Sequence, residues 1–171
     1  MTLDRGWYAA GALSVALVAA CVVHFGASGR ALVAAYFVTV LVVLSRIDLR
    51  ERRLPNRIVL PSAAGVLAAN IALEPDHALE WVLASLGAAL FLFLPLLIYP
   101  AGMGMGDVKV ALLLGAMLGE AVVLALVVGL LASFAVAVAL IAARGLAARK
   151  TSIPFGPFLA LGGIVALFVH G

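Results

Sequence analysis

Long uncharged runs, separated by short charged segments, dominate this sequence. A helix that crosses the hydrocarbon core of a bilayer needs about 20 residues, and tilt or local thinning accommodates shorter ones. Apolar residues within the runs are continuous rather than alternating, which favours helices over the strands of a membrane barrel. The runs cover residues 6–29, 31–45, 58–73, 81–106, 110–119, 121–143 and 151–171.

These runs predict an all-α fold, a polytopic transmembrane bundle of six to seven helices. Run 110–119 is short, and it reaches spanning length only if its helix begins near Asp107. The first run is long for the apolar region of a signal peptide, so we expect a retained helix there. The seven expected helices are 7–25, 31–47, 58–74, 79–99, 107–119, 120–143 and 154–170.

The composition excludes a soluble globular protein. Hydrophobic residues make up 66% of the chain and charged residues 11%, whereas a globular chain is typically about 45–50% apolar. A compact domain of 171 residues cannot hide that much apolar surface from water. The net charge of +3 is too small and scattered to indicate nucleic-acid binding. Cys21 alone cannot form an intrachain disulfide, and no Cys or His pair has the spacing of a zinc site.

The basic residues predict the orientation of the bundle. Cytoplasmic loops of membrane proteins are enriched in Lys and Arg, and the alternating helices place ten of the eleven basic residues on one side. We therefore expect a cytoplasmic N-terminus and an outer C-terminus. The ten residues are Arg5, Arg46, Arg50, Arg52, Arg53, Arg57, Lys109, Arg144, Arg149 and Lys150. The outer side would hold Arg30, Glu74, Asp76, Glu80 and Glu120.

Two aspartates lie at the ends of apolar runs, where a carboxylate is costly and by default functional. Asp48 follows the run LVVLSRI, and Asp107 follows the run that ends in YPAGMGMG. Each has a structural alternative, which is an ion pair with a nearby arginine for Asp48 and an N-cap of the fifth helix for Asp107. Both fall on the same predicted side, at helix ends where irregular backbone can line a water-accessible cavity.

A pair of carboxylates such as Asp48 and Asp107 can carry out general acid–base chemistry. Two carboxylates in one site resist ionising together, so one keeps a proton while the other remains a base. In aspartic proteases the base takes a proton from an attacking water, and the acid donates to the peptide carbonyl oxygen. Gly102, Gly104 and Gly106 leave bare backbone against which an extended substrate can form strand-like hydrogen bonds. The alternative for these glycines is a flexible loop between helices.

Three motifs follow one another along the chain. Residues 104–109 read GMGDVK, Asp48 is followed by Pro-Asn at 55–56, and residues 153–160 read IPFGPFLA. Together they resemble the signature of the type IV prepilin leader peptidases, which are membrane aspartic proteases acting at the cytoplasmic face. Presenilin-like proteases also carry GxGD, but they should show Tyr-Asp on the preceding helix, and here Ile47 precedes Asp48.

The resemblance implies an enzyme that removes the short basic leader of prepilins or pilin-like proteins, after a glycine and before their hydrophobic helix. Asp48 and Asp107 would be the catalytic pair, with acid and base unassigned, and neither a cofactor nor a metal is implied. For Lys109 the alternative is a snorkelling lysine at the membrane interface. Residues 154–157 would shape the start of the last helix rather than take part in chemistry. The active-site loop or substrate contacts would include Gly104, Gly106, Lys109, Pro55 and Asn56.

The resemblance also implies a domain division and a location. Residues 31–171 would form the membrane-embedded peptidase domain, and residues 1–30 an additional N-terminal helix with its outer turn. The protein would be a multi-pass protein of the cytoplasmic (inner) membrane of a bacterial or archaeal cell, with its active site facing the cytoplasm. Its partners would be the prepilin substrate and the lipid bilayer.

One departure from the family concerns cysteines. Larger members carry a cytoplasmic insertion with paired CxxC motifs, associated with methylation of the new pilin N-terminus. This chain contains Cys21 alone. We therefore expect a peptidase-only form, resembling the small enzymes of Tad/Flp-type or related pilus systems, and use of S-adenosylmethionine is not implied.

Two other function classes compete with this interpretation. Residues 26–29, GASG, match the GxSG of rhomboid serine proteases, but His77 and His170 are poorly placed as partners, and a tight outer turn is simpler. A small transporter or a pilus or secretion assembly subunit would use the aspartates as a proton or cation site. That function needs a path through the bilayer, whereas both carboxylates fall at one face. Gly115 and Gly119 form a GxxxG, which predicts close helix packing only.

Overall fold

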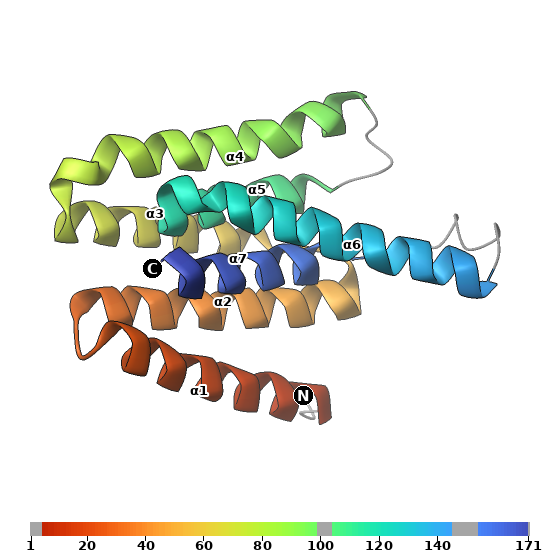
Figure 1. The fold of residues 1–171 in the computed structure, drawn as a ribbon, viewed down its shortest axis with the longest axis horizontal. Coiled ribbons are helices and arrows are strands. Elements are labelled where there is room, and N and C mark those ends of the chain that lie inside the picture. The colour runs from red at the N-terminus through yellow and green to blue at the C-terminus, as the bar shows by residue number, and fades with distance from the viewer. Residues whose placement is uncertain (1–4, 99–103, 145–153, 171) are drawn as a thin grey trace.

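The computed structural model describes residues 5–98, 104–144 and 154–170, and these ranges are almost entirely helical (Figure 1). Two short 3-10 turns connect α3 to α4 and α5 to α6, and no strand occurs in these ranges. Within the described ranges, the prediction of an all-α bundle of six to seven helices is confirmed. The helices are α1 (Arg5–Phe25), α2 (Gly29–Glu51), α3 (Asn56–Leu73), α4 (Ala78–Ile98), α5 (Met105–Leu118), α6 (Val122–Arg144) and α7 (Gly156–His170).

The turn between α1 and α2 is closed by local hydrogen bonds. Gly26 has a φ of +67°, which a residue without Cβ adopts at little cost. Ser28 is the N-cap of α2, and its Oγ accepts a hydrogen bond from the N–H of Ala31 at 3.2 Å. The GASG segment is therefore the tight turn that the sequence indicates.

Two helices form the centre of the bundle. α2 packs against α1, α3 and α7, while α5 packs against α3, α4, α6 and α7. Figure 1 shows the helices side by side along one common direction, with α1 and α4 at opposite edges. The largest fully buried side chains lie mainly on these two helices and on α7, and they include Phe37, Leu41, Leu113, Leu114 and Leu159.

The outer surface of the bundle is apolar, as a lipid-facing surface must be. Among the described residues, five helical segments are long and apolar enough to cross a membrane, and the longest, Met105–Arg144, joins α5 to α6. α7 is apolar but shorter, with 15 residues. Large apolar side chains such as Ile98, Val123 and Phe134 are exposed. Water would penalise that much exposed apolar area, whereas hydrocarbon does not.

α4 and α5 approach each other closely at Gly115. A Cβ at this position would lie 2.5 Å from the backbone of Ala84 and Ser85 on α4, which is closer than carbon atoms can pack. The missing side chain therefore lets the two backbones touch, and the close packing predicted from the GxxxG is confirmed.

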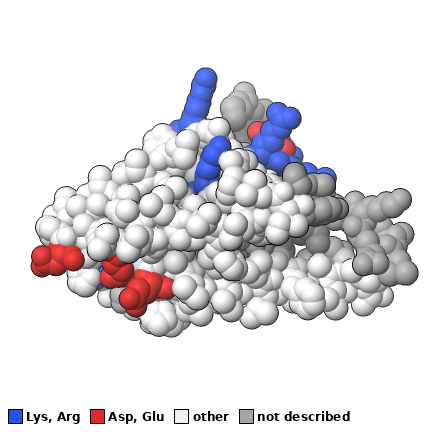
Figure 2. Space-filling view, turned by 90° about the horizontal axis from the view of Figure 1, so that it is seen from above, with Lys and Arg blue, Asp and Glu red and all other residues white. Residues whose placement is uncertain are grey.

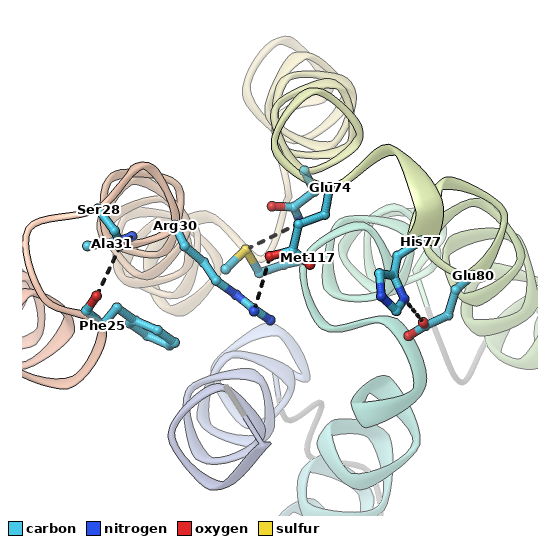
Figure 3. A network of polar contacts seen from close by, with 9 residues as sticks. Phe25, Ser28, Arg30, Ala31, Glu74, His77, Glu80 and Met117 are labelled. Atoms are coloured by element: carbon cyan, nitrogen blue, oxygen red, sulfur yellow. Dashed lines mark hydrogen bonds and ion pairs between the residues drawn. The ribbon is translucent and has the colours of Figure 1, made fainter.

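Charged side chains gather at the ends of the bundle. Figure 2 shows Asp and Glu side chains at one end, separated by uncharged surface from most of the Lys and Arg side chains in view. At that end Arg30 pairs with Glu74 at 3.4 Å, and His77 Nδ1 lies 3.1 Å from Glu80 Oε2 (Figure 3). Exposed pairs of this kind contribute little to stability, so helix packing holds the bundle together.

Candidate active site

Three helix ends converge at the end of the bundle opposite Glu74 and Glu80 (Figure 1). Asp48 lies in the last turn of α2, Asp107 lies in the first turn of α5, and Gly156 is the first residue of α7. Because α7 packs against both α2 and α5, these ends meet although they are far apart in the sequence. The structure thus places the two predicted aspartates at one end of the bundle.

Asp48 is buried at the junction of α2 with α7. Its side chain is 6% exposed, and its Oδ2 accepts a hydrogen bond from the backbone N–H of Gly156 at 3.0 Å. The first N–H groups of a helix have no acceptor within that helix, and they lie at its positive end. The start of α7 is therefore a natural partner for a carboxylate.

Asp107 is buried at the start of α5, with 7% exposure. Its Oδ2 accepts the N–H of Gly104 at 3.2 Å, while its own N–H donates to the carbonyl oxygen of Gly104 at 3.1 Å. Gly104 is the N-cap, and Asp107 is the third residue of the helix. The structural alternative, in which Asp107 is itself the N-cap, does not hold, because Gly104 occupies that position and Met105 and Gly106 precede Asp107 in the helix.

The two carboxyl groups lie within electrostatic range of each other. Asp48 and Asp107 interact electrostatically across the junction, and both are held in place by a backbone N–H rather than by a flexible side chain. Two negative charges at short range in a buried site repel each other strongly, which favours a pair that shares one proton.

The Pro-Asn motif meets the GxGD motif through a side-chain contact. Pro55 is the N-cap of α3, and its carbonyl oxygen accepts the N–H groups of Ile58 and Val59. The next residue, Asn56, accepts a hydrogen bond on Oδ1 from Lys109 Nζ at 2.6 Å. Lys109 therefore connects the start of α3 to the first turns of α5, two residues from Asp107.

Gly106 provides a second contact between the same two segments. A Cβ at this position would lie 2.8 Å from the Cβ of Leu54, so the segment before Pro55 packs directly on the bare backbone of α5. A Cβ on Gly104 would meet only ordinary contacts, 3.6 Å from Asp107 Oδ2. Gly102 lies outside the described residues.

Sequence reasoning missed the role of Gly156 and Leu54 in this junction. Residues 154–157 were expected only to shape the start of the last helix, yet the N–H of Gly156 contacts Asp48 across 108 positions of sequence. A Phe-Gly-Pro at a helix start predicts a helix boundary, and it carries no signal of the partner. Leu54 was not singled out, because an isolated leucine near a membrane interface has no pattern that marks it.

The serine-protease alternative has no support in the geometry. Ser28 lies at the opposite end of α2 from Asp48, and its Oγ donates to the carbonyl oxygen of Phe25 at 3.0 Å. His77 is engaged with Glu80 at that same end. The hydroxyl of Ser28 thus completes a turn, in agreement with its capping role.

Comparison with known proteins identifies the family. Residues 35–143, more than half of the chain, match the family model described as the type IV leader peptidase family. A prepilin leader peptidase/N-methyltransferase of Burkholderia pseudomallei (strain 1026b) is 35% identical over 166 residues, covering 91% of this chain and 52% of the relative. The protein of that name from Bacillus subtilis (strain 168) is 30% identical over 171 residues, covering 95% of this chain and 65% of the relative.

A third relative of the same name, from Aeromonas hydrophila, is 35% identical over 162 residues, covering 91% of this chain and 56% of the relative. The chain thus spans between 52% and 65% of the length of these curated relatives. No solved structure matches it. The matched range 35–143 contains both buried aspartates, the Pro-Asn motif and the GxGD motif. This chain belongs to the type IV leader peptidase family.

Proposed function

We propose that this chain is a membrane aspartic endopeptidase that removes the leader of type IV prepilins or pilin-like proteins, with Asp48 and Asp107 as its catalytic pair. The observation that carries the proposal is that two buried carboxyl groups, one from α2 and one from α5, lie within electrostatic range of each other at one end of an apolar helix bundle. Family membership and the names of the relatives support peptide hydrolysis and a prepilin substrate.

The pair supplies both the base and the acid of the reaction. The ionised carboxylate takes a proton from a water as that water attacks the peptide carbonyl, and the protonated partner donates to the carbonyl oxygen. The backbone N–H groups of Gly156 and Gly104 hold one oxygen of each carboxyl group, so neither side chain has to be ordered during the reaction. The exposed Gly104 has no side chain that would keep an extended peptide away from Asp107.

The end of the bundle that holds the aspartates is proposed to face the cytoplasm. The exposed Arg50, Arg52, Arg53 and Arg57 surround this end, while Glu74 and Glu80 lie at the other end. Basic residues are retained on the cytoplasmic side of the membrane. A leader that is still in the cytoplasm then reaches Asp48 and Asp107 without crossing the bilayer.

For this chain we propose leader cleavage without methyl transfer. The relatives are named for both activities, and the chain covers only part of their length. The 171 residues contain one cysteine, Cys21, which is fully buried on α1. The paired CxxC motifs associated with methylation in larger members therefore have no counterpart within these residues.

A cleavage assay on the purified protein tests the proposal. The chain is reconstituted in liposomes and incubated with the purified prepilin of a type IV pilus system, and mass spectrometry reads the products. We expect a single cut that releases the basic leader after its glycine. If this chain leaves the prepilin intact under conditions in which the Bacillus subtilis relative cuts it, the proposal is overturned. Proton or cation flux through these liposomes that depends on Asp48, without cleavage, would establish the transporter alternative instead.

A further inference from the structure

The first residue of α7 touches the proposed catalytic pair. Gly156 donates its N–H to Asp48 Oδ2 at 3.0 Å, and it is itself buried. The carbonyl oxygen of the preceding Phe155 accepts the N–H groups of Phe158 and Leu159. The chain turns into the helix at Phe155, which leaves the N–H of Gly156 free of the helical ladder and available to Asp48.

The N–H of Gly156 has a fixed position because α7 is locked into the bundle. Leu159 is fully buried and Ala160 nearly so. Farther along the helix, Gly162 packs against the backbone of Ala125 on α6. A Cβ on Gly163 would lie 2.5 Å from Leu114 on α5. A helix held this tightly on two neighbours cannot slide or rotate without separating them.

Position 156 has no room for a side chain beside Asp48. A Cβ there would lie 2.8 Å from Oδ2, 3.2 Å from Cγ and 3.3 Å from Cβ of Asp48. The nearest of these atoms is the end of the carboxyl group, which is free to rotate away, whereas the backbone of α7 is fixed. Gly156 does not have a positive φ, so its lack of a side chain matters for space and not for backbone conformation.

We infer that Gly156 is a positioning residue for Asp48. Its N–H fixes the orientation of the carboxyl group toward Asp107, and its missing side chain leaves the space that this orientation needs. The inference rests on the proposed function, because it assumes that Asp48 takes part in catalysis. It assigns to α7, which lies beyond the range 35–143 of the family match, a direct part in shaping the active site.

Replacement of Gly156 by alanine tests the steric half of this inference. Alanine is a better helix former than glycine, so α7 is retained while the new methyl group displaces the carboxyl group of Asp48. A misplacement of about 1 Å at a reacting group can reduce the rate about 100-fold. For Gly156→Ala we therefore expect the kcat of the folded fraction to fall by about one to two orders of magnitude, with KM for the prepilin within about twofold.

Two glycines serve as matched controls. Gly29→Ala, at the opposite end of α2 from Asp48, crowds the side chain of Leu73, so it should lower the unfolding temperature while the folded fraction keeps its kcat. Gly65→Ala places its methyl group in open space and should change neither property. A Gly156→Ala protein with wild-type kcat would overturn the inference. So would a loss that Gly29→Ala matches in kcat at equal folded fraction.

An amide-to-ester replacement tests the hydrogen bond itself, without added bulk. Glycolic acid is incorporated at position 156 in place of glycine during cell-free synthesis into liposomes. This replaces the N–H by an ester oxygen, which cannot donate to Asp48, and adds no bulk. We expect kcat to fall at least about tenfold with KM unchanged, the scale of one hydrogen bond to a charged group. An unchanged kcat contradicts the assignment. Asp48→Asn distinguishes failure of this inference from failure of the proposed function. If Asp48→Asn is inactive while neither change at position 156 alters kcat, only the positioning role fails. If Asp48→Asn is active, the proposed function fails.

Discussion

Lys109 Nζ lies 2.6 Å from Asn56 Oδ1, and this hydrogen bond joins α5 to the start of α3 beside the buried Asp107. The two residues belong to separate sequence motifs, and each was expected to line the active site or contact substrate. The contact shows that they are partners of each other. Lys109 thus has a partner within the bundle, and the pair holds the start of α3 against the first turns of α5.

Double substitution of this pair distinguishes positioning from substrate binding. Lys109→Met and Asn56→Ala should each lower kcat/KM about tenfold, the scale of one charge-assisted hydrogen bond. Because both changes remove the same bond, the double variant should be no worse than the poorer single variant. Prepilin cleavage rates of the four proteins form the cycle. Effects that multiply would show instead that each side chain contacts the substrate independently.

Gly106→Ala should destabilise the same junction by crowding Leu54. The new methyl group meets Leu54 Cβ and Cδ1 at 2.8 and 3.0 Å, and overpacking of this kind costs about 1–3 kcal/mol. Thermal unfolding in detergent should show a lower midpoint, and Leu54→Gly in the same protein should recover part of the loss. Gly87→Ala, whose methyl group meets open space, is the control. No recovery in the double variant would contradict the contact.

The orientation of the bundle is tested by the accessibility of introduced cysteines. In a Cys21→Ala protein, cysteines at Arg53 and Pro75 lie exposed at opposite ends of the bundle. An impermeant thiol reagent added to intact cells should label position 75 and leave position 53 unmodified until the cells are lysed. The reverse labelling would place Asp48 and Asp107 on the outer side and remove the cytoplasmic active site.

Methyl transfer is tested with radiolabelled S-adenosylmethionine. The purified chain, incubated with prepilin and this reagent, should release the leader while the mature pilin gains no label. These 171 residues contain a single cysteine, Cys21, which is buried on α1. The cysteine pairs associated with methylation in larger family members are therefore absent from them. Label on the new N-terminus would show that the reaction does not need them.

Much of the fold follows from the sequence because charge is so costly in lipid. The charged residues therefore mark the helix ends, and the expected helix 58–74 corresponds to α3 at Asn56–Leu73. The alternation of spans also brings Asp48 and Asp107 to the same end. This reasoning predicts only those features that a single type of residue marks, such as a helix end marked by a charge.

Contacts between distant segments are not predicted by the same reasoning. Asp48 and Gly156 are 108 positions apart, and their contact depends on how α7 packs between α2 and α5. The capping of α5 by Gly104 rather than Asp107 depends on where the backbone turns, and a glycine-rich segment has no side chains to mark that point. Packing and local backbone geometry, rather than composition, determine these details of the site.

Asparagine substitution of the two aspartates is the most direct test of the account. Asn keeps the size of Asp but cannot accept and return a proton, and general acid–base groups typically contribute about 10²–10⁴-fold. In liposomes that contain equal amounts of inserted protein, Asp48→Asn and Asp107→Asn should each reduce prepilin cleavage by that factor. The double variant should be little worse, because the pair acts as a unit. Asp76→Asn, exposed at the other end of the bundle, should cleave at the wild-type rate. Near wild-type cleavage by either single variant of the pair would contradict the proposed catalytic dyad.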